Sequence, residues 1–251
     1  MSKPGDTWTS PGGEMQLRCG DWREVLADVV ECDAVITDPP YSERTEKGVR
    51  SGSGENAARA AVGMGYDFIT EEWCHLFADH WCSRCGWMFI CGDHVTQRWH
   101  EAAAIQSSRY VFPPIPLVKN GAAPRMCADG PASQSEFCTV SRPKSGAFVG
   151  AWPGIRGWYK METVRHGHGH GHVGVRGAKS VDFMRAIIKD YSRPGDLIVD
   201  PCAGGGTTLL AAAIEGRRAI GAEMDPETYD KAVARLSRGY TPSFLPLMEE
   251  K

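Results

Sequence analysis

The stretch Asp200-Pro-Cys-Ala-Gly-Gly-Gly-Thr-Thr208 decides the fold. It follows an apolar run, 197–199, that predicts a buried strand. It leads into 207–215, where Leu and Ala residues predict a helix. Three glycines therefore lie where a strand passes into a helix. Glycine lets the backbone approach a ligand closely, and the first turn of the helix offers unpaired N–H groups, so we expect a ligand-binding loop.

A second strand, 218–222, follows the helix and ends at Glu223. An acid at the tip of the second strand of such a unit can accept hydrogen bonds from both ribose hydroxyls of a nucleoside cofactor. The loop lacks the lysine of a triphosphate-binding P-loop, and its glycines are not spaced G-x-G-x-x-G as for pyrophosphate cofactors. The loop alone leaves open a purely structural strand-to-helix turn.

The composition is that of an ordinary globular domain, with 42% hydrophobic and 24% charged residues. A chain of 251 residues suits a single α/β domain, here 1–251. No apolar run is long enough to span a bilayer, and 1–10 has no apolar signal core. Nine cysteines in such a chain predict reduced thiols and a cytoplasmic location.

The charge is distributed unevenly along the chain. The net charge of -3 taken alone argues against a nucleic-acid partner. Segment 119–179, however, holds nine Lys/Arg and three Asp/Glu, which leaves 19 basic and 28 acidic residues elsewhere. A basic segment on an acidic body predicts a patch that binds a polyanion.

Strand and helix patterns alternate along the chain, which predicts an α/β fold with a mostly parallel sheet and helices on both faces. We expect the residues before Gly13 to be frayed. The sequence predicts a flexible loop over 42–69 and an extended stretch over 110–118, despite the three prolines in that stretch. The predicted strands are 15–19, 33–37, 87–91, 137–140, 197–199 and 218–222. The predicted helices are 22–29, 71–83, 95–105, 181–191, 207–215 and one that starts at Asp225-Pro226.

The tetrapeptide Asp38-Pro39-Pro40-Tyr41 ends the strand 33–37. Since ligands in parallel sheets lie outside the carboxyl ends of the strands, Asp38 and Gly204 can line one crevice. The Asp38 carboxylate and the Pro39 carbonyl would form a pair of acceptors that suits an –NH₂ group with two protons to donate. Tyr41 can stack on the face of a nucleobase. The alternative is a capped strand followed by a Pro-Pro turn.

The two motifs together resemble the S-adenosylmethionine-dependent amino-methyltransferases of DNA, most closely the circularly permuted (beta-type) group in which the catalytic tetrapeptide precedes the cofactor loop. The resemblance is clearest over 20–41 and 179–236 and weaker over 71–144. It implies a Rossmann-like, doubly wound domain with a basic inserted target-recognition region at 119–179. The target base would be flipped out of the duplex.

The resemblance also implies roles for single residues. Asp38 would bind the target amine with the Pro39 carbonyl, and Tyr41 would stack on the base. Glu223 would hold the ribose, and Met224 would flank the adenine ring. The further cofactor-binding residues that it implies are Asp21, Asp200, Ala203, Gly204, Gly205, Gly206, Thr207 and Thr208.

The chain departs from the family pattern at three positions. Cys202 lies where Phe is common, and Gly205 lies where Ser is common. Ser180 stands where Pro often follows a lysine, so the role of Lys179 stays open. Aspartate at the start of the tetrapeptide favours adenine N6 as the target, with cytosine N4 as the alternative.

The expected partner is double-stranded DNA, together with S-adenosylmethionine as cofactor and a homodimer as a further expectation. Direct methyl transfer needs neither an enzyme nucleophile nor a metal. The rival hypotheses are an RNA or protein-amide methyltransferase and a non-catalytic DNA-binding protein. The intact Asp38 and Tyr41 argue against the non-catalytic protein.

Three further patterns have two readings each. His166, His168, His170 and His172 alternate with glycine, which is typical of a loop and less so of a metal site. Cys82-x-x-Cys85 reads as buried thiols more readily than as a zinc site, because no second such pair exists. Aromatic and basic residues over 152–165 could contact DNA or pack in a core.

Overall fold

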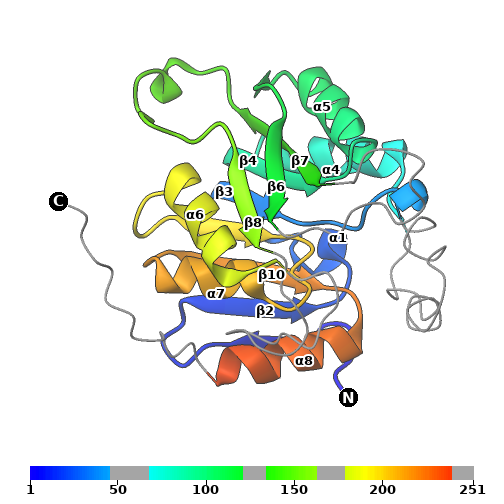
Figure 1. The fold of residues 1–251 in the computed structure, drawn as a ribbon. Coiled ribbons are helices and arrows are strands. Elements are labelled where there is room, and N and C mark those ends of the chain that lie inside the picture. Colours follow the sequence, from blue (N-terminus) through cyan, green and yellow to red (C-terminus); the bar gives the residue numbers. More distant parts are fainter. Residues whose placement is uncertain (46–67, 121–133, 163–178, 239–251) are drawn as a thin grey trace.

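The computed structural model describes residues 1–45, 68–120, 134–162 and 179–238. In these ranges ten strands form one mixed sheet in the order β1-β2-β10-β9-β3-β4-β7-β6-β8, and β5 pairs with β7. Helices cover both faces of the sheet (Figure 1). The α/β class predicted from the sequence is confirmed.

The elements alternate along the chain as the patterns indicate. The strands are β1 (Thr7–Thr9), β2 (Met15–Cys19), β3 (Cys32–Thr37), β4 (Cys85–Gly92), β5 (Tyr110–Val111), β6 (Ile115–Asn120), β7 (Ser135–Arg142), β8 (Tyr159–Glu162), β9 (Leu197–Asp200) and β10 (Arg218–Glu223). The helices are α1 (Trp22–Val25), α4 (Glu71–Trp81), α5 (Thr96–Gln106), α6 (Val181–Tyr191), α7 (Thr207–Ile214) and α8 (Pro226–Ser237), with a 3₁₀ turn at Gly146–Phe148.

The centre of the sheet is parallel. β2, β10, β9, β3 and β4 run in one direction. β1 at one end and β7 beyond β4 run antiparallel to their neighbours. The carboxyl ends of the five parallel strands therefore meet at one edge, which is where ligands bind in sheets of this kind.

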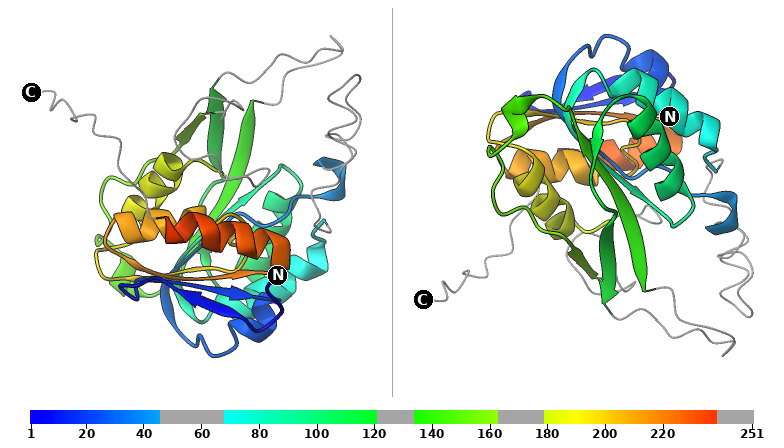
Figure 2. Two further views of the ribbon diagram at one scale, coloured as in Figure 1. Left: turned by 90° about the horizontal axis from the view of Figure 1, so that it is seen from below. Right: turned by 90° about the horizontal axis from the view of Figure 1, so that it is seen from above.

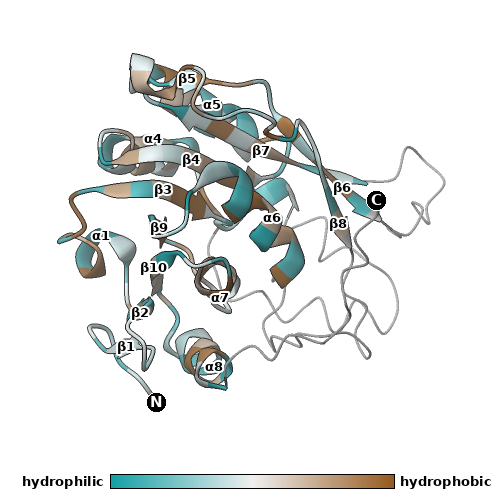
Figure 3. Ribbon diagram, turned by 90° about the vertical axis from the view of Figure 1, so that its left-hand side faces the viewer, coloured by the Kyte–Doolittle hydropathy of each residue, from teal (hydrophilic) through white to brown (hydrophobic). Residues whose placement is uncertain are grey.

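Two apolar cores hold the helices to the sheet, one on each face. Figure 3 shows α6, α7 and α8 on one side of the sheet and α1, α4 and α5 on the other. Side chains of α6, α7 and α8, such as Ile187, Leu209 and Tyr229, pack into one core. Side chains of α1, α4 and α5, such as Trp22 and Phe77, pack into the other. Both faces of the central strands are thus removed from water, in agreement with their nearly continuous apolar sequences.

Helix starts follow the capping signals. Ser180 precedes α6, and its side chain accepts a hydrogen bond from the Phe183 N–H at 3.3 Å. Asp225 precedes α8 and accepts from the Thr228 N–H at 2.9 Å, with Pro226 in the first turn. Figure 2 shows the N-terminus beside α8, where the Ser2 N–H lies 3.2 Å from a carboxylate oxygen of Asp230.

Two predictions near the N-terminus were wrong. The residues before Gly13 are not frayed, because Thr7–Thr9 form β1 and pair with β2. The helix predicted over 22–29 ends at Val25. Arg18 from β2 donates to the Val25 carbonyl at 2.6 Å and pairs with Asp28, which holds the following residues in a turn.

The extended stretch 110–118 is confirmed as strands β5 and β6, which are separated by Pro113 and Pro114. Pro116 lies inside β6 opposite Phe137 of β7. Pairing with β8 begins only at Leu117, so the missing N–H of Pro116 falls outside that ladder.

Segment 119–179 contributes to the main sheet. Its residues 135–142 form β7, which pairs with the central strand β4. Its role in target recognition stays a prediction. Residues 46–67 and the glycine-histidine run at 166–172 lie outside the described residues. No helix in the described ranges is both long and apolar enough to cross a bilayer.

Candidate active site

The two motifs that the sequence singles out lie at the carboxyl ends of adjacent strands. β3 and β9 pair in parallel, with Val35 opposite Val199. Asp38 directly follows β3, and Asp200 is the last residue of β9. The Thr37 hydroxyl donates a 2.7 Å hydrogen bond to the buried Asp200 carboxylate. The structure therefore brings the tetrapeptide and the glycine loop to one place.

The chain leaves these two strands toward opposite faces of the sheet. β9 leads into α7 on one face, and β3 leads toward α4 on the other. A parallel sheet is open for ligands at such a point, because no crossover connection covers the gap between the strand ends. β10 and β2 diverge in the same way, toward α8 and α1.

The glycine loop turns by means of two left-handed residues. Gly204 has φ 50° and Gly206, which caps α7, has φ 75°. The Ala203 N–H donates to the Ala222 carbonyl of β10 at 2.8 Å, so the loop folds back over that strand. A Cβ on Gly204 would meet no atom within 4 Å, which leaves this backbone open for contact.

Two residues that sequence reasoning missed support the loop from behind. Arg235 of α8 donates to the Gly205 carbonyl at 2.7 Å and contacts the Thr207 hydroxyl at 3.0 Å. Gly221 in β10 leaves room for the loop, since a Cβ there would lie 2.9 Å from the Ala203 Cβ. Glycine within a strand is a signal for such a close approach, whereas nothing in the sequence links Arg235 to the loop.

Buried carboxylates line the loop. Burial raises the pKa of Asp200 to about 6, although it accepts hydrogen bonds from the Thr37 and Thr208 hydroxyls and the Cys202 N–H. Burial likewise raises the pKa of Glu223 to about 7, and Glu223 is only 4% exposed. In the described part of the chain Glu223 accepts from backbone N–H groups of Asp225 and Gly204 and pairs with no cation.

The remaining predicted cofactor residues lie at the same edge. The Gly20 N–H donates to the Glu223 carbonyl at 2.8 Å, which places Asp21 beside the end of β10. Asp21 caps α1 and pairs with Arg23, and the Arg23 hydrogen bonds lower the pKa of its carboxyl. Met224 follows β10 and is 56% exposed, which leaves an apolar side chain free at the rim.

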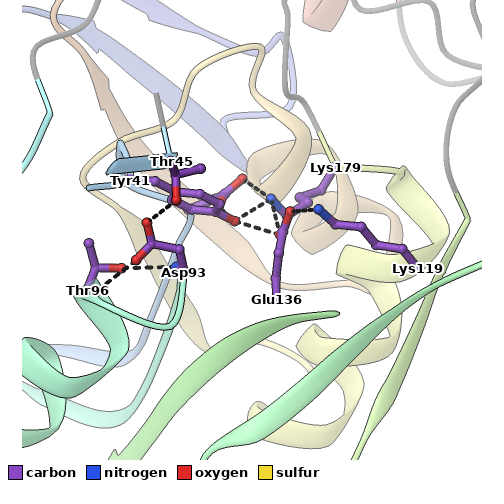
Figure 4. Close-up of polar contacts among 8 residues, drawn as sticks. Tyr41, Thr45, Asp93, Thr96, Lys119, Glu136 and Lys179 are labelled. Carbon is purple, nitrogen blue, oxygen red and sulfur yellow. Dashed lines mark hydrogen bonds and ion pairs between the residues drawn. The ribbon is translucent and has the colours of Figure 1, made fainter. Parts of the chain in front are cut away.

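Asp38 and Tyr41 belong to a polar cluster that the sequence did not reveal. Figure 4 shows Tyr41 in this cluster with Lys119, Glu136 and Lys179. The Lys179 ammonium lies 2.7 Å from Asp38 Oδ2, 2.9 Å from the Tyr41 hydroxyl and 3.1 Å from Glu136 Oε2. The Tyr41 hydroxyl donates to Glu136 at 2.6 Å and lies 3.1 Å from Asp38 Oδ1. Lys119 of β6 pairs with the other oxygen of Glu136 at 2.6 Å.

The charges of this cluster compensate one another. Burial opposes the charge of Lys179, but Asp38 and Glu136 raise its pKa above the usual value, so it stays an ammonium. Burial alone would raise the pKa of Glu136, yet Lys179 and Lys119 lower it to about 2. Burial raises the pKa of Asp38, Lys179 opposes this effect, and Glu136 adds to it.

The segment after the tetrapeptide is tied to the end of β4. Asp93 accepts a hydrogen bond from the Thr45 hydroxyl (Figure 4). It also accepts from the hydroxyl and the N–H of Ser42. Asp93 also accepts hydrogen bonds from the Val95 and Thr96 N–H groups at the start of α5. These donors outweigh burial and lower the pKa of Asp93 to about 2. Asp93 therefore fixes where the chain goes after Tyr41.

Several of the other candidate residues pack in the interior, whereas Trp158 is 57% exposed. Cys82 and Cys85 are buried in the core beneath α4, in agreement with the expectation of core thiols. Trp152 packs against Trp87, and Tyr159 is 3% exposed. Within the described ranges no group of three His, Cys, Asp or Glu side chains could hold a metal ion.

Comparison with known proteins identifies the class. The family model of DNA methylase, of the N6/N4 type, matches residues 32–234. This match spans both strand ends of the candidate active site. The chain belongs to the DNA methylase family.

Curated relatives match over part of their length. The type II methyltransferase M.Cfr9I of Citrobacter freundii is 30% identical over 146 residues, which cover 55% of this chain and 48% of the relative. M.XycI of Xanthomonas campestris pv. cyanopsidis matches with the same identity and coverage. The chain thus spans about half the length of these relatives.

Solved structures share the fold. The M1.HpyAVI–SAM complex has a TM-score of 0.64 at 23% identity and covers 88% of this chain and 98% of its own. The cytosine-N4-specific PvuII DNA methyltransferase has a TM-score of 0.64 at 14% identity and covers 94% of this chain and 89% of its own. The Rossmann-like methyltransferase fold expected from the sequence is confirmed.

Proposed function

We propose that this protein transfers a methyl group from S-adenosylmethionine to the exocyclic N6 amine of an adenine flipped out of duplex DNA. The observation that carries the proposal is the adjacency of Asp38 and the Asp200 loop at the ends of β3 and β9. This adjacency supports a site in which the amine that receives the methyl group faces a nucleoside cofactor.

The loop residues fit the cofactor. Glu223 is a buried carboxylate that lacks a cationic partner among the described residues, and ribose hydroxyls would supply the donors that it needs. The open backbone at Gly204 and the exposed Met224 side chain suit the methionine part and the adenine ring. Asp21 would approach the adenine from β2. The other residues that would hold the cofactor are Asp200, Ala203, Gly205, Gly206, Thr207 and Thr208.

When bound, S-adenosylmethionine would supply a methyl group on a positively charged sulfur. The chain's own residues would prepare the acceptor. The Asp38 carboxylate and the Pro39 carbonyl would take the two amine protons as hydrogen bonds and draw the nitrogen lone pair out of the ring system. Pro40 stiffens the turn that aims both acceptors, and Tyr41 would pack against the base.

The base identity and the polymer are the finer parts of the proposal. Aspartate at position 38 supports adenine, while the N6/N4 family and a cytosine-N4-specific fold neighbour keep cytosine N4 as the second candidate. The basic segment 119–179 supports DNA as the polyanion. A homodimer and a cytoplasmic location stay predictions.

Mass analysis of the product tests the proposal. The protein is incubated with S-adenosylmethionine carrying a deuterated methyl group and, side by side, with duplex DNA, RNA and protein. The nucleic acids are digested to nucleosides and the protein to peptides, and the masses of the products are measured by mass spectrometry. We expect deuterated N6-methyladenine from DNA. N4-methylcytosine would establish the second candidate, and label in RNA or protein alone would overturn the proposal.

A further inference from the structure

Lys179 lies beside Asp38, the residue to which the proposed function assigns the amine of the base. Its side chain is 8% exposed, and its ammonium lies 2.7 Å from one oxygen of Asp38, the carboxylate that would accept an amine proton. Lys179 directly precedes α6, which Ser180 caps, so its backbone is held by a regular helix start. The cluster therefore presents a fixed acceptor, Asp38, next to a fixed donor, Lys179.

On the Watson–Crick edge, this order of acceptor and donor has a counterpart on only two of the four DNA bases. In adenine and in cytosine the exocyclic amine, a donor, is next to an unprotonated ring nitrogen, an acceptor. On the same edge of guanine the exocyclic amine is next to a ring N–H donor, and thymine has a ring N–H donor between two carbonyl acceptors and no amine. Enzymes that flip a base read this Watson–Crick edge by hydrogen bonds.

We propose, resting on the proposed function, that Lys179 reads the flipped base by donating a hydrogen bond to the ring nitrogen beside the target amine. That atom is N1 of adenine or N3 of cytosine. Asp38 accepts from the amine, and the pair admits adenine and cytosine while it opposes guanine and thymine.

The hydrogen bonds balance when the base enters. One contact opens, the 2.7 Å pair between Lys179 and Asp38. Two contacts form, from the amine to Asp38 and from Lys179 to the ring nitrogen. The ammonium keeps its contacts with the Tyr41 hydroxyl at 2.9 Å and with Glu136 at 3.1 Å. A buried ammonium that lost its only carboxylate would be costly, and Glu136 removes that cost.

Glu136 is accordingly a positioning residue. It holds Lys179 through one oxygen and Lys119 through the other. The two lysines neutralise Glu136 and Asp38, so the cluster carries no net charge when no base is bound. Glu136→Gln would leave the fold of β7 in place, but it would remove one of the two carboxylates that pair with the Lys179 ammonium. The ammonium would then pair more strongly with Asp38.

The test combines a protein substitution with a substitution of one atom in the DNA. Duplexes carry either adenine or 1-deazaadenine, in which N1 is a C–H group, at the methylated position. If product analysis identifies cytosine, 3-deazacytosine takes this place. Methyl transfer is measured as kcat/KM for the wild-type protein, for Lys179→Met and for Glu136→Gln.

We expect the wild-type protein to lose a factor of about 10 to 100 on the deaza duplex. Lys179→Met, slower on the natural duplex, should show a loss on the deaza duplex that is about tenfold or more smaller than the loss in the wild-type protein, since the contact is already absent. Glu136→Gln should show an intermediate loss. The altered reactivity of the deaza base affects every protein alike and cancels in the comparison.

Equal losses in the wild-type protein and in Lys179→Met would overturn the inference. Should Lys179→Met fail to fold, wild-type rates that are equal on both duplexes would overturn it, and Lys179→Gln would replace the variant. Failure of the proposed function itself gives a different result, namely no methyl transfer to the natural duplex by the wild-type protein.

Discussion

The Thr37 hydroxyl donates a 2.7 Å hydrogen bond to Asp200, which is 163 residues further along the chain. Thr37 immediately precedes Asp38, and Asp200 begins the glycine loop. This one contact joins the segment that would hold the amine to the segment that would hold the cofactor. Both of its partners are buried, at 0% and 2% exposure, so water does not compete for it.

Thr37→Val should weaken both halves of the site. The substitution keeps the shape of the side chain but removes a hydroxyl donor from Asp200, a carboxylate that is already buried with a pKa of about 6. We expect a loss of about 1–3 kcal/mol in the free energy of unfolding at pH 8. Chemical denaturation would measure it. Thr37→Ser retains the donor, and a loss as large in that variant would contradict the account.

Gly221→Ala should displace the glycine loop. The new Cβ would lie 2.8 Å from a Leu209 methyl carbon and 2.9 Å from the Ala203 Cβ, closer than such atoms approach. We expect the protein to fold with a cost of about 1–3 kcal/mol and to bind S-adenosylmethionine weakly, as calorimetry would show. Gly157→Ala, where no atom lies within 4 Å, is the control and should have no effect.

Arg235→Met should weaken cofactor binding, because it removes hydrogen bonds to the glycine loop and adds no atom to the space that the loop occupies. The substitution retains an apolar stem and removes the donors to the Gly205 carbonyl and the Thr207 hydroxyl. We expect cofactor affinity to fall about tenfold. Arg238→Met, at the exposed end of the same helix, serves as the control. Unchanged affinity in Arg235→Met would show that the loop holds its shape alone.

Cofactor binding should depend on pH through Glu223. Its pKa of about 7 in the free protein means that the carboxyl is protonated below that pH, while ribose hydroxyls need the ionised form as acceptor. We expect the association constant to fall about tenfold per pH unit from pH 7 to pH 5. Glu223→Gln should bind weakly at every pH. A flat profile for the wild-type protein would contradict the role of Glu223.

Glu223 should affect protein stability in the opposite way: cofactor affinity rises with pH, whereas the free energy of unfolding without cofactor falls. Burial raises the pKa of Glu223 from 4.5 to about 7, so the folded state binds more protons than the unfolded state between these pH values. Stability from this group is therefore lost as pH rises from about 4.5 to about 7, by about 3 kcal/mol at most. Without cofactor, Glu223→Gln should melt at a higher temperature than the wild-type protein at pH 8.

The sequence predicts the elements whose local signals agree. α6 carries a serine cap, a helical apolar spacing and a following Arg-Pro-Gly turn, and it spans 181–191 as predicted. The parallel strands are short apolar runs between turn residues. The location of the site follows from a rule about strand ends, so the meeting of Asp38 with the Asp200 loop could be inferred without any contact being known.

The remainder depends on tertiary contacts that leave no local pattern. Glu136 is an ordinary polar residue near the start of β7, and only the register of that strand brings it to Lys179. The early end of α1 depends on Arg18, which reaches from β2 to the Val25 carbonyl. Arg235 occupies a helix position that periodicity marks as partly exposed, although it supports the loop from behind.

The central claim is that Asp38 acts on the acceptor amine while the neighbouring loop holds the cofactor. Measuring both properties of Asp38→Ala tests it most directly, with Asp182→Ala, an exposed aspartate on α6, as the control. The account predicts that Asp38→Ala binds S-adenosylmethionine nearly as the wild-type protein does but transfers methyl groups to duplex DNA about 100 to 1,000 times more slowly. Transfer at the wild-type rate by Asp38→Ala would contradict it.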